Sequence, residues 1–165
     1  MNELEEISRR VRPLKVIWVG MVAGVVLFTG VAMLLIRMGA FTPIPALRAG
    51  AGMTIAIVLV LGLVGAQFVR RIVEKTPASA TRSQVAAKWQ AGWIVGQAIK
   101  EGIGLAGVVL AMLTGASSWA MAFGVASAAS MIMTPPWEAE LHERLQRAQP
   151  DPDQPQTQTQ TQKQP

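Results

Sequence analysis

The chain has 165 residues, 51% of them hydrophobic, and a mean hydropathy of +0.35, which exceeds what a soluble core of this size requires. This composition indicates an integral membrane protein. The excess of 15 Lys and Arg over 10 acidic residues is typical of basic loops retained in the cytoplasm, so nucleic-acid binding is not expected. Because the chain contains no cysteine, disulfides, thiolate catalysis, iron–sulfur clusters and zinc sites with cysteine ligands are excluded.

Two uncharged segments predict the first two transmembrane helices, at 16–36 and 49–69. Each has 21 residues, which as a helix makes about 31 Å and matches a hydrocarbon core about 30 Å thick. The first is longer than a signal-peptide core and is expected to stay as an anchor. Before it, Ile7, Val11 and Leu14 recur at helical spacing and predict a short amphipathic helix along the membrane surface.

The uncharged run 102–137 has 36 residues and is too long for one span. A small, polar stretch at 114–118 predicts a turn that divides it, with the third and fourth spans at about 91–113 and 118–134. Thr81 and Gln84 form a capping-box pattern, so the third helix is expected to protrude into the cytoplasm before it enters lipid. This arrangement places Lys100 and Glu101 inside the third span, whereas the alternative three-span arrangement would place them at an interface.

The distribution of basic residues favours four spans with both termini in the cytoplasm. Four, five and three basic residues of the N-terminal segment, the 70–92 loop and the C-terminal segment then lie inside, and only Arg37 and Arg48 lie outside. From this pattern we expect the protein to be integral to the plasma membrane, which in bacteria is the inner membrane. Tryptophans are expected as interface anchors, four on the cytoplasmic side and one outside: Trp18, Trp89, Trp93, Trp137 and Trp119.

Beyond the fourth span the sequence predicts a short helix and then a disordered tail. Glu140 and Arg144, and likewise Glu143 and Arg147, are spaced for i,i+4 ion pairs on an exposed helix. Residues 149–165 are rich in Pro, Gln and Thr and contain no apolar residue that could build a core. The expected fold is therefore all-α: a four-transmembrane-helix bundle with short cytoplasmic amphipathic helices in residues 1–148, followed by the tail.

Gln97, Lys100 and Glu101 form the candidate intramembrane polar site. An ionisable residue inside a span costs roughly 2.5–3.5 kcal/mol, which makes a role the first hypothesis. Helical spacing puts Glu101 on the face of Gln97, and Lys100 on a face with Trp93 and several glycines. Three interpretations stay open: Lys100 snorkels toward the cytoplasm, the residues bind a proton or cation, or they make a polar contact that fixes helix assembly.

Small residues at i,i+4 spacing occur in all four predicted spans and predict close helix packing. These are Gly20 and Gly24 in the first span, Gly62 and Ala66 in the second, Gly92 and Gly96 in the third, and Ala120, Gly124 and Ala128 in the fourth. Gly104 and Gly107, three residues apart, lie on the small-residue face of the third span as well.

Catalytic patterns are missing from the sequence. The single histidine, His142, lies in the predicted C-terminal helix, and both aspartates, Asp151 and Asp153, lie in the tail. No P-loop, HExxH or GxSxG pattern occurs. We expect no enzyme, catalytic residue, cofactor, metal or small-molecule substrate.

The stretch 98–110, Ala-Ile-Lys-Glu-Gly-Ile-Gly-Leu-Ala-Gly-Val-Val-Leu, resembles the glutamate-bearing helix of the subunit c proteolipids of rotary ATP synthases. The likeness covers 13 of 165 residues. It implies that Glu101 is a carboxylate that cycles between neutral and ionised forms, and that Gly104 and Gly107 permit close packing in a ring. As a whole, the chain resembles small four-span bacterial membrane proteins of unknown role.

The leading hypothesis is a non-enzymatic structural, assembly or interaction component of the membrane, with the lipid bilayer, further copies of itself or another membrane protein as partners. One alternative is a proton- or cation-translocating component that uses Glu101 and Gln97. A second alternative is a scaffold that recruits a soluble partner through its cytoplasmic helices.

Overall fold

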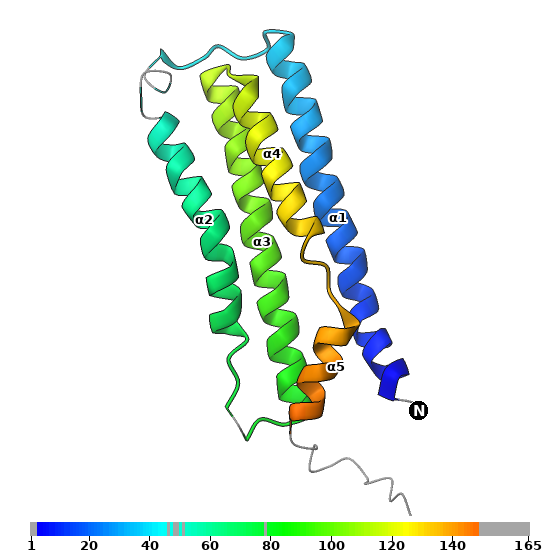
Figure 1. Cartoon of the computed structure of the whole chain (residues 1–165). Coiled ribbons are helices and arrows are strands. Elements are labelled where there is room, and N and C mark those ends of the chain that lie inside the picture. The colour runs from blue at the N-terminus through cyan, green and yellow to red at the C-terminus, as the bar shows by residue number, and fades with distance from the viewer. Residues whose placement is uncertain (1–2, 46, 48–49, 51, 78, 149–165) are drawn as a thin grey trace, which may run out of the picture.

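The computed structural model describes residues 3–45, 47, 50, 52–77 and 79–148. In this part of the chain there are five helices and no β-strand: α1 (Glu3–Arg37), α2 (Gly52–Val73), α3 (Arg82–Thr114), α4 (Ser117–Ile132) and α5 (Glu138–Arg147). The first four run side by side and alternate in direction, and α5 lies at the end of the bundle where α1 begins (Figure 1). The all-α prediction is confirmed, whereas the expected tail, 149–165, lies outside the described residues.

The sequence predicted that the amphipathic N-terminal segment is a separate helix on the membrane surface, and this prediction is wrong. The segment forms the first turns of α1, which runs without interruption through Pro13. The reason is tertiary packing: Ile7, Val11 and Leu14 are buried in a cluster with side chains of α3 and α5. Since these apolar residues continue the buried side of the helix, one helix buries them better than two would.

The third helix is the centre of the bundle, because α3 packs against α1, α2, α4 and α5. Its predicted start is confirmed: the Thr81 side chain accepts a bond from the Gln84 backbone, and Gln84 bonds back to the Thr81 backbone. Its end is set by Gly115, whose positive φ of 67° suits glycine and stops the helix. The break divides the long uncharged run, as its length predicted.

The fourth helix begins and ends close to the predicted span 118–134, and the short helix expected after it is α5. With 16 residues, α4 is about 24 Å long, and residues 133–136 follow as a non-helical segment. The prolines at 135 and 136 lie in this segment and not in the first turn of α5, which begins after its N-cap Trp137. Both expected i,i+4 ion pairs of α5 are confirmed, between Arg144 and Glu140 and between Arg147 and Glu143.

Of the five described helices, three are long and apolar enough to cross a membrane: α1 from Ile7, α2 and α3. Half of the most apolar window of α3 is buried in the protein, but only 17% of those of α1 and α2. In α2 only Gly52, Ala56 and Ala66 are buried, all on the side that packs against α3. The large apolar side chains on the outer sides of α1 and α2 are exposed, as expected for surfaces in contact with lipid.

Candidate functional site

Lys100 lies inside the bundle and is bonded to the C-terminal end of α4. Its side chain is buried, and Nζ donates to the carbonyl oxygen of Ser130 at 3.1 Å and to Oγ1 of Thr134 at 2.6 Å. The Lys100 carbonyl in turn accepts a bond from Oγ of Ser127 at 2.7 Å. Of the three interpretations from the sequence, these contacts correspond to a polar contact that fixes helix packing.

Three more side chains bond to this end of α4 or to Thr134, two residues beyond it. Trp18 Nε1 donates to the carbonyl of Met131 at 2.9 Å. Trp93 Nε1 and Gln97 Nε2 both donate to the carbonyl of Thr134, at 3.2 and 2.7 Å. With Lys100, these form the α4 cap, which we define as Trp18, Trp93, Gln97 and Lys100.

The α4 cap has a clear physical role. The last carbonyls of a helix have no partner within the helix, and they carry a partial negative charge from the aligned peptide dipoles. The ammonium of Lys100 supplies a positive charge there, while the indole and amide groups supply hydrogen bonds. An apolar bundle can thereby contain a helix that ends in its interior.

Glu101 points elsewhere, although it follows Lys100 directly in the chain. It is partly buried, and its Oε1 lies over α1, 3.8 Å from where a Cβ on Gly24 would be. Among the residues that the structure describes, no group hydrogen-bonds or forms an ion pair with its carboxylate. An ionised carboxylate in apolar surroundings is costly unless it is paired, so Glu101 calls for a further partner.

Gln97, which the sequence placed in a polar site with Glu101, is held by hydrogen bonds to another residue. Its Nε2 is bonded to Thr134, but its Oε1 is buried and has no bonding partner in the described part of the chain. Gln97 and Glu101 share one side of α3 by helical spacing, yet Gln97 bonds to the α4 end, whereas Glu101 lies over α1.

The five tryptophans have different environments. Trp89 and Trp93 are 1% and 0% exposed, so their indoles contact protein and not lipid, unlike the expected interface anchors. They are covered because the first turns of α1 and α5 pack over them. Trp18 is partly buried by its bond to α4, Trp119 stacks on Phe123 with ring centroids 6.0 Å apart, and Trp137 is 61% exposed.

Most of the small residues singled out from the sequence lie at helix contacts. A Cβ on Gly104 would be 2.7 Å from Ser127, and one on Gly107 or Gly124 would collide with a neighbouring side chain. A Cβ on Gly92 would collide with Glu74, those on Gly62 and Gly96 would make tight contacts at 3.1 and 3.2 Å, and the alanines at 66, 120 and 128 are buried. Gly20 and Gly24 are different, because a Cβ on Gly20 would meet nothing within 4 Å and one on Gly24 would make only an ordinary contact with Glu101, at 3.8 Å.

A network of four charged side chains joins α5 to the segment that ends α2. Glu74 is 7% exposed and accepts bonds from Arg70 at 2.5 Å and from Arg144 at 2.8 Å. Glu140 accepts from the same two arginines, at 2.9 Å each. Sequence reasoning missed this network, although the i,i+4 spacing of Arg70 and Glu74 was a signal that could have indicated it.

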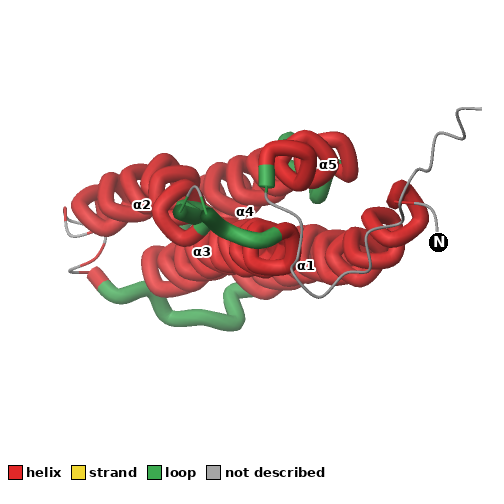
Figure 2. Tube along the Cα trace, turned by 90° about the horizontal axis from the view of Figure 1, so that it is seen from below, coloured by secondary structure: helices red, strands yellow, loops and turns green. Residues whose placement is uncertain are grey.

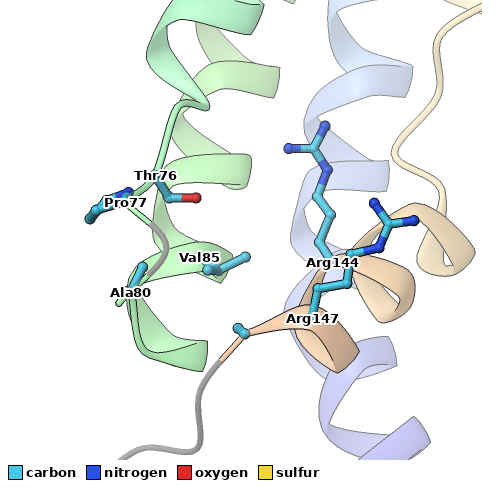
Figure 3. A pocket seen from close by; sticks show the side chains of 7 residues that line it. Thr76, Pro77, Ala80, Val85, Arg144 and Arg147 are labelled. Atoms are coloured by element: carbon cyan, nitrogen blue, oxygen red, sulfur yellow. The ribbon is translucent and has the colours of Figure 1, made fainter.

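The hollow beside this network does not offer a free cationic site. It has a volume of about 230 Å³ and lies between α5 and the loop after α2, with Arg144 and Arg147 across from Thr76 and Pro77 (Figure 3). Both arginines are already in ion pairs with glutamates. Within the described residues there is also no cluster of three or more side chains suited to hold a metal ion.

Comparisons with protein-family models, curated proteins and solved structures find no match for this chain. The local resemblance of residues 98–110 to subunit c proteolipids therefore stays a prediction. The chemistry of the site has to be argued from the contacts of Lys100 and Glu101.

Proposed function

We propose that the protein is a four-span, non-enzymatic component of a bacterial inner membrane that assembles with other membrane proteins, with both termini in the cytoplasm. The alternating direction of α1 to α4 supports this topology (Figure 1). The basic residues at the α5 end, which include Arg70 and Arg144, would then lie on the cytoplasmic side.

The α4 cap explains how a helix of about 24 Å contributes a fourth span. Residues 133–136 continue beyond it as a non-helical segment that starts with a turn, because the Met133 backbone is still right-handed helical and Thr134 N–H bonds to the carbonyl of Met131. Non-helical backbone at membrane depth is tolerated where protein surrounds it and satisfies its polar groups. Trp18, Trp93, Gln97 and Lys100 provide such bonds, which gives the buried lysine a structural reason to lie in the membrane.

The observation that carries the assembly role is the unpaired carboxylate of Glu101. Lys100 beside it bonds to Ser130 and Thr134, whereas no group among the described residues bonds to the Glu101 carboxylate. The bare outer sides of α1 and α2 provide surface for contacts with further helices. A non-enzymatic role agrees with the sequence, which has no catalytic pattern.

Native membranes extracted directly into lipid nanodiscs would test the assembly role. Mass measurement of the purified particles is expected to find more protein than a single copy of the chain. Particles that contain one copy and no second protein, in every preparation, would refute the proposal.

The alternative is a proton or cation site, and a separate observation favours it. Gln97 Oε1 is buried without a partner one helical turn from Glu101, so a protonated Glu101 could donate to it after a change of side-chain conformation. In reconstituted vesicles with a pH-sensitive dye, Glu101→Gln should then abolish an ion flux that the wild type shows. Equal flux in both proteins, or none in the wild type, would exclude this alternative.

The scaffold alternative rests on the amphipathic N-terminal segment and on the charged segment 137–148. Because Ile7, Val11, Leu141 and Leu145 are buried against one another and α3, a soluble partner would bind the charged side chains of α5 and not an apolar surface.

A further inference from the structure

One side of α3 is left open between α1 and α2, which lie on either side of α3 and α4 (Figure 2). The exposed residues on this side recur at helical spacing, and we call them the open face of α3: Ile94, Ala98, Gly102, Ala106 and Val109. The open face is thus a stripe on one helix, bordered by its two neighbours.

The middle of the open face has almost no side chain. Ala98, Gly102 and Ala106 are four residues apart, and a Cβ on Gly102 would meet nothing within 4 Å. At glycines of the same helix that face the bundle interior, such as Gly96 and Gly107, side chains of α2 and α4 occupy the space where a Cβ would lie. Small residues at this spacing let a second helix approach closely, so the open face fits a helix and not a bulky side chain.

Glu101 gives this face its chemistry. It borders the stripe on the side of α1, is partly exposed, and has no bonding partner among the described residues. A carboxylate in lipid is stabilised by a basic side chain, with which it forms a charge-assisted hydrogen bond. The occupant that complements the face is therefore a helix with a lysine or arginine in its apolar part.

A second copy of the chain meets this requirement poorly. Lys100, the one intramembrane lysine of the described spans, is 3% exposed and bonded to Ser130 and Thr134. Two copies that met at the open face would instead bring two Glu101 carboxylates together. Like charges in apolar surroundings repel, so the face disfavours self-association unless a proton is taken up.

We infer that the open face of α3 binds a transmembrane helix of another protein, and that a lysine or arginine of that helix pairs with Glu101. This inference rests on the proposed assembly role and adds the chemistry of the partner. It is distinguishable from that role, because an assembly found in nanodiscs could form through a different surface.

The test uses the full chain in phospholipid vesicles with synthetic leucine–alanine transmembrane peptides that differ at one position about two turns from one end. One peptide carries Lys there and its match carries Leu. Energy transfer between labelled protein and peptide reports binding. The Lys peptide is expected to bind about tenfold more tightly, and Glu101→Gln should abolish this preference while the isosteric amide keeps the fold.

A matched pair of glycine variants locates the binding surface. Gly102→Leu fills the open face and should weaken binding of both peptides about tenfold or more, whereas Gly30→Leu should not. Both glycines have open space around them, so neither change should unfold the protein. Equal binding of the Lys and Leu peptides to the wild type would overturn the inference. The inference would also be overturned if the wild type showed no preference for the Lys peptide but associated with itself, and if Glu101→Gln removed this self-association.

Discussion

The contact of Lys100 with the end of α4 is the feature whose energy can be worked out most directly. Lys100→Met removes the charge and keeps a long apolar side chain in the same space. A charge at a partly buried helix end contributes up to about 2 kcal/mol. Two hydrogen bonds in a membrane protein add about 0.6 kcal/mol each. These contributions add up to roughly 3 kcal/mol. Because the variant no longer has to bury a charged ammonium, part of this loss is offset, and we expect the free energy of unfolding to fall by about 1–3 kcal/mol.

The assay is reversible unfolding in mixed micelles with increasing SDS, followed by tryptophan fluorescence. Trp18 bonds to the last turn of α4 and Trp93 to Thr134 just beyond it, so both indoles report detachment of this part of the chain. Lys88→Met is the matched control, because Lys88 is exposed on the same helix and should change stability by less than about 0.5 kcal/mol.

A double-mutant cycle with Thr134→Val tests the contact itself. The two changes should be non-additive by 0.5 kcal/mol or more, on the order expected for residues in contact. If Lys100→Met leaves the protein as stable as the wild type and the two changes simply add, the role assigned to the α4 cap is refuted.

Further predictions concern packing, the ion network and topology. Gly107→Leu should destabilise the bundle by about 3 kcal/mol or prevent folding, because its Cβ alone collides with Phe123; in the SDS assay Gly30→Leu should have little effect. Glu74→Gln breaks bonds to two arginines and should cost about 1–3 kcal/mol and expose α5 to protease, whereas Glu143→Gln, in an exposed pair, should cost under about 1 kcal/mol. A cysteine introduced at residue 41 should react with an impermeant maleimide on intact cells, and one at residue 79 only after permeabilisation; the reverse pattern would refute the proposed orientation.

The helices were predictable from the sequence because each depends on a local signal. Apolar length marks α1, α2 and α3, the capping box at Thr81 marks the start of α3, and Gly115 marks its end. The N-terminal segment was misassigned because its apolar periodicity is also only a local signal. The periodicity shows that one side of the helix is buried, but it does not show whether that side packs against lipid or against protein. Packing on α3 and α5 decided that, and joined the segment to α1.

The partners of the polar residues could not be predicted, because they depend on which helices lie together and in what register. Lys100 and Glu101 are neighbours in the chain, and residue types alone suggest that they act as a pair. A rotation of about 100° between successive helical positions turns Lys100 toward α4 and leaves Glu101 beside Gly24. The network of Glu74 with Arg144 likewise joins residues 70 positions apart.

By itself, the sequence determined that the chain is helical and that several helices are long and apolar enough to cross a membrane, since apolar length depends only on the order of the residues. The tertiary structure alone decided what its buried charges do. Burial makes each charge depend on the groups within about 3 Å, and those are set by the contacts between helices. Lys100 is thereby bonded within the chain, at the end of a short helix, whereas Glu101 has no bonding partner among the described residues.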